Sequence, residues 1–290
     1  MMMKVGFVGL GAMGGPMARN LHKAGLLAAV YNRSPEKARA LAAELGCAAA
    51  ANVADLAKLC DAVVLCVSAD ADVSQVVDAL AGSLKRGALV LDCSTVSAET
   101  ARKAAARLAE SGVDFLDCPV SGGTEGAKNA TLAMMCGGTE AAFARAQPIL
   151  QALGKRLALM GPIGAGQATK AVNQIVVAGV AQAVSEALAF AEAQGLSLDK
   201  VIDVVGSGAA QSWFLTNRGP NMMRMSFPLG FKVALHDKDL DIVQQMAATQ
   251  GVQLPIVEMT RIHYRRLMEQ AHGDEDISSL FRLKQSLFKR

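Results

Sequence analysis

Residues 4–17 read KVGFVGLGAMGGPM, and this stretch decides the fold of the chain. An apolar run, Lys4–Val8, precedes the glycines, and a helical pattern, Pro16–Ala24, follows them. The order of strand, G-x-G-x-x-G turn and helix is typical of a unit that binds a dinucleotide at the start of its helix. The predicted cofactor contacts in this turn are Gly9, Leu10, Gly11, Ala12, Met13 and Gly14.

The three spaced glycines have separate physical roles. Gly9 lets the chain turn sharply away from the strand, Gly11 lets main-chain N–H groups approach a pyrophosphate, and Gly14 lets the helix pack closely on the strand. An ordinary glycine turn is the alternative. A second apolar run, Ala28–Tyr31, follows the helix as a βαβ unit requires, and it favours the dinucleotide site.

The residues after the second predicted strand indicate which cofactor is bound. An acidic side chain there would bind the ribose 2′-hydroxyl of NAD, but the chain reads Tyr31-Asn32-Arg33-Ser34. The guanidinium of Arg33 suits the 2′-phosphate of NADP. We therefore predict NADP, with NAD as the second choice, and cofactor contacts from Asn32, Arg33 and Ser34. The alternative is that Arg33 is a solvated surface charge, with Ser34 as a helix cap and Pro35 in the first helical turn.

The size and charge of the chain limit what it can be. With 290 residues, of which 52% are hydrophobic, the chain is long enough for two ordinary domains with a substantial core. A net charge of +3 is too small to indicate a nucleic-acid partner. The basic segment Phe281–Arg290 is interpreted as the solvated face of a last helix.

The cysteines and histidines predict neither a metal site nor a disulfide framework. All six cysteines fall in the first half of the chain without a C-x-x-C pair, and the four histidines show no H-x-x-x-H spacing. We expect reduced thiols, mostly buried, and chemistry without a metal.

The expected location is the cytoplasm, because no targeting segment is recognisable. The apolar run Ala171–Ala193 raises the question of a membrane span, but amide, hydroxyl and carboxylate side chains interrupt it. These side chains fit a buried helix better than a helix in lipid. We predict no membrane partner.

Two regions of different character follow one another along the chain. Up to about residue 160, short apolar runs alternate with alanine-rich helical stretches, which predicts a parallel sheet with helices on both faces. The predicted strands are Lys4–Val8, Ala28–Tyr31, Ala62–Val67, Leu89–Asp92, Asp114–Leu116, Leu132–Cys136 and Arg156–Met160. Only helical patterns follow the turn-rich segment Gly161–Gly166. We predict a Rossmann-type α/β domain over residues 1–162 and an all-helical domain over residues 163–290, built on a long inter-domain helix.

Polar residues follow several of the predicted strands. Ligands of open parallel sheets bind beyond the carboxyl ends of the strands, so these residues are candidates for a site. Thr95 and Ser121 supply hydroxyl groups, and Gly122 and Gly123 supply N–H groups able to hold a carboxylate. Each of them could equally be a loop cap.

The start of the second region carries a lysine in an unusual position. Lys170, Asn173 and Gln174 are spaced i, i+3 and i+4, and so share one face near the start of the long helix. Helix N-termini repel cations, which makes a lysine there odd for stability alone. The alternative is a lysine that extends its charge to solvent while its stem packs on the helix.

Several segments together resemble the β-hydroxyacid dehydrogenase family, which includes 3-hydroxyisobutyrate dehydrogenase, tartronate semialdehyde reductase and the glyoxylate/succinic semialdehyde reductases. The matching segments are Val5–Pro16, Asp92–Thr95, Asp117–Gly126, Gly164–Gln174 and Phe231–Leu240, in the family's order. The resemblance implies a nucleotide-binding domain joined by a long helix to a helical domain, in homodimers or homotetramers. It also implies a small β-hydroxyacid or semialdehyde substrate.

The resemblance implies roles for individual residues. Lys170 matches the catalytic lysine, Asn173 the substrate-binding asparagine, and Ser121-Gly122-Gly123 the loop that holds the substrate carboxylate. Gln174 stands where many members repeat asparagine, and we expect little consequence because both are amides. The implied cofactor contacts outside the glycine turn are Val67, Ser68, Asp72, Thr95 and Lys238.

The implied chemistry is hydride transfer with Lys170 as general acid and base. A lysine must have its pKa lowered by about three units to act near neutral pH, and burial, the helix N-terminus and a positive nicotinamide ring all lower it. The rivals are an imine reductase of the same architecture, a decarboxylating 6-phosphogluconate dehydrogenase, and a non-catalytic NADP-binding oligomerisation module. The first and last usually lack the lysine, and the second has a much larger helical domain.

Aromatic residues of the second region are further candidates for the substrate pocket. Trp213 and Phe214 follow the small-residue run Gly206–Ala210, and they could wall the pocket or belong to the core or an interface. Arg218 could pair with a substrate acid or with a neighbouring carboxylate.

Overall fold

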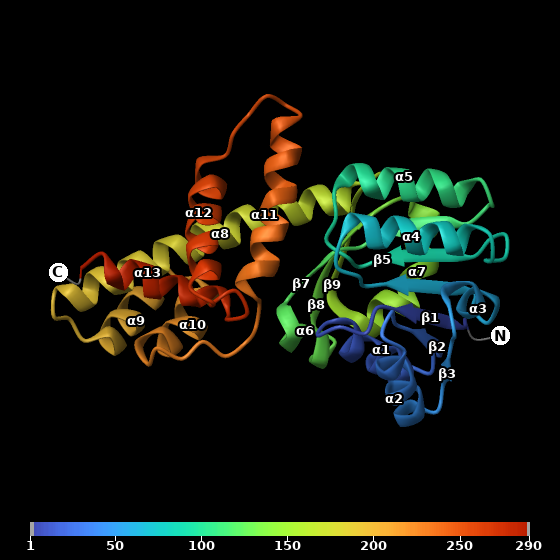
Figure 1. The fold of residues 1–290 in the computed structure, drawn as a ribbon, viewed down its shortest axis with the longest axis horizontal. Helices are drawn as coiled ribbons and strands as arrows, with labels where there is room; N and C mark the ends of the chain where they lie inside the picture. Colours follow the sequence, from blue (N-terminus) through green and yellow to red (C-terminus); the bar gives the residue numbers. More distant parts are fainter. Residues whose placement is uncertain (1–2, 289–290) are drawn as a thin grey trace. The chain divides into compact units, whose positions relative to one another are not determined.

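The computed structural model describes residues 3–288, so the last two residues of the predicted basic helix, 289 and 290, lie outside the described part. The chain divides into two compact units, one ending at Lys170 and one beginning at Ala171. This division falls inside the helix α8 (Ala165–Ala193), a few residues beyond the domain boundary expected near residue 162. Each unit is described separately below (Figure 1).

The first unit is built on one sheet, whose strands in order are β3-β2-β1-β4-β5-β6-β8-β7, with β9 paired to β8. From β3 to β6 all neighbours are parallel, and their order is that of a doubly wound dinucleotide-binding sheet. The strand bounds are β1 (Val5–Val8), β2 (Leu27–Tyr31), β3 (Ala48–Ala49), β4 (Ala62–Leu65), β5 (Leu89–Asp92), β6 (Asp114–Asp117), β7 (Val120–Ser121), β8 (Leu132–Gly137) and β9 (Gly154–Gly161).

The predicted parallel sheet is confirmed from β3 to β6 and is wrong at β8, which runs antiparallel to both β6 and β7. After β6 the chain returns through the two-residue strand β7 and the short helix α6 (Gly123–Asn129). Since no long helix crosses the face of the sheet here, the chain direction is not restored before the next strand.

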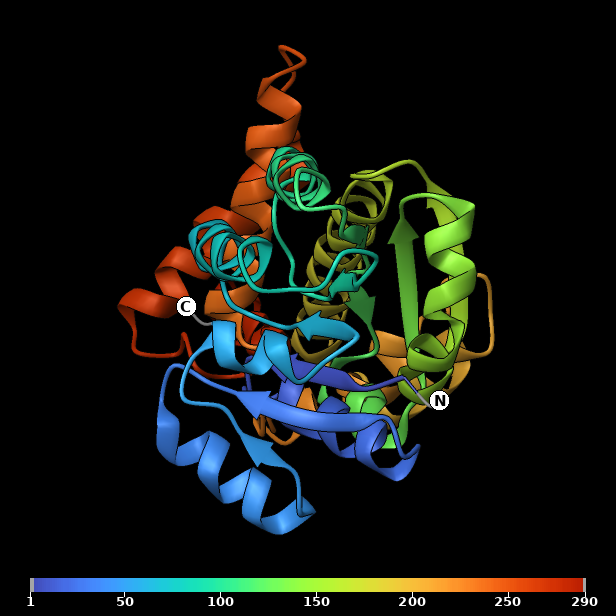
Figure 2. The ribbon, with the colours of Figure 1, turned by 90° about the vertical axis from the view of Figure 1, so that its right-hand side faces the viewer.

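Helices cover both faces of this sheet, as predicted. The helices α1 (Gly14–Lys23), α2 (Pro35–Leu45) and α7 (Glu140–Leu153) pack on one face. The helices α3 (Val53–Lys58), α4 (Asp70–Ala81) and α5 (Ala98–Ala109) pack on the other. Figure 1 shows α4 and α5 above the sheet and α1 and α2 below it, and Figure 2 shows the same layers from the side.

The strand sequences fit this arrangement because their apolar residues alternate between the two faces. In β4, Val64 packs into the first hydrophobic cluster, whereas Val63 and Leu65 pack into the second. Strands buried on both faces read as continuous apolar runs, which is what the sequence showed.

In the described residues of the second unit, 171–288, the regular elements are all helices, and one isolated antiparallel bridge joins Lys232 and Asp276. Leu188, Met222, Tyr264 and Phe281 are almost fully buried in its core. Besides the larger part of α8, its helices are α9 (Leu198–Gly206), α10 (Trp213–Met223), α11 (Val233–Ala248), α12 (Pro255–Glu269), the 3₁₀ turn η1 (Ile277–Ser279) and α13 (Leu280–Ser286).

The long helix α8 is apolar and long enough to cross a membrane by length and composition alone. Half of its most apolar window is buried inside the protein, and Ala178, Ala181 and Leu188 are in the core of the second unit. This burial fits the buried helix that the interrupted apolar run predicted better than a helix in lipid.

Candidate active site and cofactor site

The glycine turn follows β1 at the point where the strand order reverses, between β1 and β4. Gly9 has φ +96°, and a Cβ there would collide with the main-chain oxygen of Cys66. A Cβ at Gly14 would collide with the main-chain oxygen of Gly9. A Cβ at Gly11, in contrast, would meet no atom within 4 Å. The packing of the protein thus requires glycine at two positions, and Gly11 leaves open the space that a pyrophosphate would approach.

Asn32 supports the glycine turn from the end of β2. Its Oδ1 accepts the N–H of Leu10 at 2.9 Å, and its Nδ2 donates to the main-chain oxygen of Ser34 at 3.2 Å. Ser34 is the N-cap residue of α2 and Pro35 its first residue, as predicted, although the Ser34 hydroxyl makes no capping bond. The sequence interpretation of this segment as a helix start is confirmed.

A hollow of about 320 Å³ lies beside the glycine turn in the first unit. One of its cationic residues, Lys37, was not identified as a candidate from the sequence. Its position four residues after Arg33, at the start of α2, could have identified it. The hollow is lined by Leu10, Gly11, Ala12, Gly15, Pro16, Arg19, Lys37, Ala40, Leu41 and Glu44.

Two predicted cofactor residues from distant parts of the sequence meet in the structure. Nη1 of Arg33 lies 3.1 Å from Oδ1 of Asp72, the third residue of α4. The Arg33 side chain is 85% exposed and Asp72 is 25% exposed, so the guanidinium remains accessible to a ligand. An exposed pair of this kind adds little to stability.

The loops after β4 and β5 are joined by hydrogen bonds. The N–H of Val67 donates to Oγ of Ser94 at 2.9 Å, and the N–H of Ser94 donates to Oδ1 of Asp92 at 2.9 Å. The segments that hold Val67 and Thr95 therefore form one connected edge at the carboxyl end of the sheet.

Asp92 is a fully buried carboxyl group at this edge. Its Oδ2 has no hydrogen-bond partner among the described residues, and burial raises its pKa to about 7, although bonds from Ser94 oppose the shift. Sequence reasoning did not identify Asp92 as a titrating group, because the burial of one strand end depends on the strands on either side of it.

Lys170 lies in the first part of α8 and is 7% exposed. Its Nζ donates to the main-chain oxygen of Val120 at 2.9 Å. The next residue after Val120 is Ser121, and Gly122 follows with φ +132°, a conformation that favours glycine. The structure thus places the predicted catalytic amine beside the predicted carboxylate loop, within the first unit.

The beginning of α8 is held by Asp117, the last residue of β6. Its carboxylate accepts the N–H of Gly164 at 2.8 Å and that of Gln167 at 2.9 Å. Burial raises the pKa of Asp117 above its ordinary value, and the bonds from these N–H groups oppose that shift. The family resemblance covered Asp117 without giving it a role.

In the second unit, three predicted residues gather around Asp239, which sequence reasoning missed. Nε2 of Gln174 donates to Oδ2 of Asp239 at 2.6 Å, and Nζ of Lys238 lies 2.9 Å from its Oδ1. Nδ2 of Asn173 donates to Oε1 of Gln174 at 2.7 Å. The Lys-Asp-Leu segment that identified Lys238 was the signal that could have identified Asp239.

The two aromatic candidates of α10 have different environments. Phe214 is 8% exposed in the core of the second unit, whereas Trp213 is 61% exposed. The Arg218 guanidinium lies 5.2 Å from the Trp213 ring, and its Nε lies 3.4 Å from Oδ1 of the buried Asp276. Of the two partners considered for Arg218, the structure shows the neighbouring carboxylate.

All six cysteines are free thiols, as expected, and burial raises the pKa of the Cys60 thiol to about 12. Over residues 3–288, no three His, Cys, Asp or Glu side chains come together as a metal site would require.

Comparison with known proteins agrees with this architecture. A family model described as the NAD binding domain of 6-phosphogluconate dehydrogenase matches residues 4–161. A second, described as NAD-binding of NADP-dependent 3-hydroxyisobutyrate dehydrogenase, matches residues 164–284. Together they cover almost the whole chain.

Individual relatives point to the same family. The chain is 38% identical to the 2-hydroxy-3-oxopropionate reductase of Escherichia coli over 256 residues, which covers 87% of each chain. It is 34% identical to the NAD-dependent L-serine dehydrogenase of Pseudomonas aeruginosa, covering 97% of this chain and 98% of the relative. The solved structure of Mycobacterium tuberculosis 3-hydroxyisobutyrate dehydrogenase with L-serine is similar with a TM-score of 0.90 and 31% identity, covering 98% of this chain and 99% of that one.

The dinucleotide-binding strand order, the glycine turn and these relatives lead to one assignment. The resemblance inferred from the sequence is confirmed, and the protein is an enzyme that uses NAD(P) to act on hydroxyacids. The chain belongs to the β-hydroxyacid dehydrogenase family.

Proposed function

We propose that this enzyme transfers a hydride between NADP and a short β-hydroxyacid or its semialdehyde, with Lys170 as general acid and base. One observation carries the proposal: the buried amine of Lys170 bonds to Val120 directly before the Ser121-Gly122-Gly123 turn. A proton-transferring group and a carboxylate-binding turn side by side are what a hydroxyacid needs.

The reaction requires one proton transfer by the protein. When bound, the nicotinamide cofactor accepts the hydride in oxidation and donates it in reduction. In oxidation, neutral Lys170 takes the hydroxyl proton while the carbon–oxygen double bond forms, and in reduction its ammonium form returns that proton to the oxygen. Burial disfavours the ammonium form of a lysine and thus helps it to lose its proton near neutral pH.

The substrate carboxylate is assigned to the Ser121 hydroxyl and to the N–H groups of Gly122 and Gly123. Asn173 is assigned to the remaining polar groups of the substrate. Gln174 belongs to the same site, where its buried amide bonds to Asn173 and to Asp239 and so orients the Asn173 side chain. Trp213 is exposed enough to contact a ligand, and we assign it to the wall of the substrate site.

The preference for NADP rests on the absence of an acidic residue after β2 and on Arg33, with Lys37 as a second nearby cation. Ser34 and Asn32 complete this end of the site. The ion pair with Asp72 holds the Arg33 guanidinium at the start of α4 and competes with the 2′-phosphate for it. The glycine turn, Val67, Ser68, Thr95 and Lys238 are assigned to the rest of the cofactor.

The cofactor preference is tested by Arg33→Asp in steady-state assays with both cofactors. The carboxylate would repel the 2′-phosphate and could bind a ribose hydroxyl, so kcat/KM should shift toward NAD by ~10-fold or more, the size of one charged contact. Lys58→Asp, which changes an exposed cation of α3, is the control. If Arg33→Asp leaves the ratio of kcat/KM with NADP to kcat/KM with NAD unchanged, the preference for NADP is refuted.

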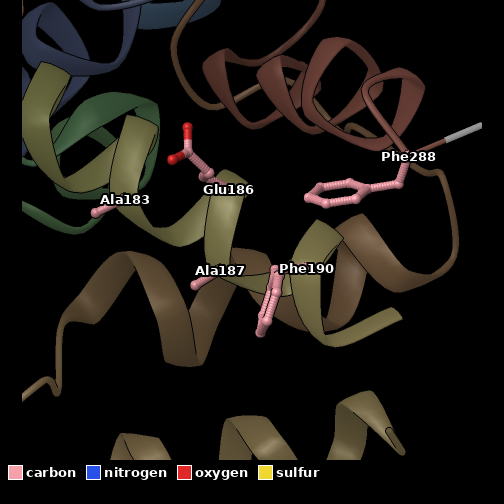
Figure 3. Close-up of a pocket in the computed structure, with 5 residues that line it drawn as sticks. All are labelled: Ala183, Glu186, Ala187, Phe190 and Phe288. Carbon is pink, nitrogen blue, oxygen red and sulfur yellow. The ribbon is translucent and has the colours of Figure 1, made fainter. Parts of the chain in front are cut away.

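We also propose that the enzyme is cytoplasmic and forms homodimers or homotetramers. A groove of about 360 Å³ on the second unit supports self-association, and its lining residues are Ala183, Glu186, Ala187, Phe190 and Phe288 (Figure 3). Phe190 and Phe288 line it with their rings 6.3 Å apart, and they are 53% and 43% exposed. Exposed aromatic surface of this kind is a frequent site of protein–protein contact.

The rival functions are an imine reductase and a non-catalytic NADP-binding module. The buried lysine beside a carboxylate-binding turn favours the hydroxyacid reaction over both. The test is a spectrophotometric assay of short β-hydroxyacids and semialdehydes with NADP(H) and NAD(H), with a cyclic imine as the competing substrate class. Turnover of the imine alone, or cofactor binding without turnover of any substrate, would reject the proposal.

A further inference from the structure

A buried polar residue at the start of α8 uses its side chain to bond to main-chain atoms of a neighbouring loop. Gln167 is 1% exposed and lies in the first turn of α8. Its Oε1 accepts the N–H of Val96 at 3.2 Å, and its Nε2 donates to the main-chain oxygen of Ser94 at 2.9 Å. These two groups stand on either side of Thr95, so Gln167 bonds to the main chain both before and after it.

The chemistry of this position calls for a carboxamide. One bond needs an acceptor and the other needs a donor, and a carboxamide offers both from one planar group. A glutamate at the same length could not donate to the Ser94 oxygen, and an apolar side chain would leave both buried main-chain groups without a partner. The residue type therefore follows from the contacts.

Lys170 follows Gln167 by three residues and so lies on the same side of the helix. Its Nζ bonds to Val120 in the loop after β6, while Gln167 bonds to the loop after β5. One helical turn thus connects the ends of two neighbouring strands. A shift of α8 along or about its axis would move the amine relative to Thr95.

The packing around this turn leaves little room for such a shift. A Cβ at Gly166 would lie 2.8 Å from Oδ2 of Asp117, and a Cβ at Gly137 would lie 2.9 Å from the N of Gly166. Asp117 in turn accepts the N–H of Gln167. The helix start is therefore in close contact with β6 and β8, and the Gln167 side chain adds the contact with the loop after β5.

We propose that Gln167 is a positioning residue, which holds the Lys170 amine at a fixed place relative to Thr95 by bonding to the main chain on both sides of Thr95. The consequence for catalysis rests on the proposed function of Lys170, whereas the geometric claim does not. A reacting group displaced by ~1 Å can slow a reaction by ~10²-fold. Gln167 itself is not assigned to substrate or cofactor.

The geometric claim is tested with Gln167→Met, which keeps the length of the side chain and removes both hydrogen bonds. Thr169→Val is the matched control, since it removes one hydrogen bond of the same helical turn, from Thr169 Oγ1 to the Ala165 oxygen. Two measurements without substrate apply: hydrogen exchange of the Val96 amide, and the rate at which an amine-reactive reagent labels Lys170, read by mass spectrometry. Gln167→Met should raise both rates by ~5-fold or more because the turn opens locally, and Thr169→Val should leave both unchanged.

The catalytic claim is tested by steady-state kinetics of the same variants on the substrate found in the panel assay. Gln167→Met should lower kcat by ~10- to 100-fold, with the KM values of substrate and cofactor within ~3-fold of the wild type, because the binding groups stay in place. A merely structural role would lower the melting temperature and the fraction of active enzyme without raising the labelling rate of Lys170.

The outcomes separate this inference from the proposed function. Wild-type labelling of Lys170 in Gln167→Met, or an equal loss of kcat in Thr169→Val, overturns the inference, as does faster labelling with an unchanged kcat. If Gln167→Met does not fold, Gln167→Glu replaces it, because a glutamate keeps the acceptor for the Val96 N–H and loses only the donor for Ser94. Lys170 of Gln167→Glu should still be labelled faster than in the wild type. An unchanged labelling rate in this variant also overturns the inference. If the wild type oxidises no hydroxyacid, the proposed function fails, and the labelling experiment still decides whether Gln167 positions the amine.

Discussion

Lys170 combines a buried ammonium group with a main-chain partner, Val120, at 2.9 Å. Charged groups are rarely buried without a reason, because burial disfavours their charged form. The proposed role of Lys170 as general acid and base would give this burial a function.

We predict that Lys170→Ala lowers turnover by at least ~10²-fold while cofactor binding is retained, because only proton transfer is lost. The measurement is kcat for oxidation together with fluorescence titration of NADPH. Lys128→Ala removes an exposed lysine of α6 in the same unit and should keep full activity. An active Lys170→Ala variant with the pH profile of the wild type would contradict the role of Lys170.

The buried carboxyl group of Asp92 should make the free energy of unfolding depend on pH. Its pKa in the folded protein is about 7, above the value of about 3.9 for an unfolded aspartate, because burial disfavours the carboxylate. The folded state therefore binds more protons between these values, and the free energy of unfolding falls as pH rises through this window, by at most ~1.4 kcal/mol per pH unit. Well above pH 7 the carboxyl group is ionised in both states, so Asp92 no longer changes the free energy of unfolding with pH.

We expect Asp92→Asn to remove much of this slope. The contribution of Asp92 should fall by ~2 kcal/mol between pH 5 and pH 8, so the variant should gain stability over the wild type at pH 8 and gain much less at pH 5. Urea unfolding at both pH values measures this difference. Asp114→Asn, a half-exposed aspartate of β6, serves as the control. Equal slopes in wild type and Asp92→Asn would show that the carboxyl group does not titrate in this window.

Among the elements, the glycine turn contains one glycine that the packing of the protein requires and one that only a bound ligand would require. Gly14→Ala should destabilise the protein by ~1–3 kcal/mol, because its Cβ would collide with the Gly9 oxygen where α1 meets β1. Gly11→Ala should leave stability unchanged and weaken NADPH binding, since its Cβ has space that only a ligand would fill. Thermal unfolding without cofactor and fluorescence titration measure the two effects. A loss of stability in Gly11→Ala would mean that its space is needed by the protein itself.

The elements that the sequence did not predict are those with weak local signals. The helix α10 contains Gly219 and Pro220, two residues that disfavour helix interiors, although Ser212 caps its start. The helix α6 has only seven residues and includes two glycines. The direction of β8 depended on how the chain returns after β6, which no residue pattern of β8 itself records.

At the scale of the whole molecule, self-association is the property to test. We predict that Phe190→Glu lowers the mass of the assembly in solution, because it replaces an exposed aromatic ring of the groove in Figure 3 by a second carboxylate beside Glu186, which opposes burial of that surface. Light scattering coupled to gel filtration measures the mass. Asp203→Lys, an exposed change on α9, is the control. An unchanged mass for Phe190→Glu would place the interface elsewhere, and a monomeric wild type would reject the proposed assembly.

The dinucleotide-binding βαβ start, the layered α/β unit and the helical unit could all be predicted from the sequence. They follow from glycine spacing, from short continuous apolar runs for the strands and from the 3.6-residue period of the helices, all of which act between neighbours along the chain. Residue patterns already marked Lys170 and the Ser121-Gly122-Gly123 turn as candidates, and the family resemblance added their roles, because each belongs to a contiguous motif.

The pairing of polar groups, in contrast, is visible only in the folded chain. Gln167 bonds to Ser94 across 73 positions of sequence, Asp117 bonds to Gln167 across 50, and Arg33 pairs with Asp72 across 39. These pairs exist because the strand order brings distant strand ends to one edge of the sheet, where buried polar groups must find partners or lose stability. Local periodicity carries no record of that order, so the residues that hold the candidate site in place became visible only in the fold.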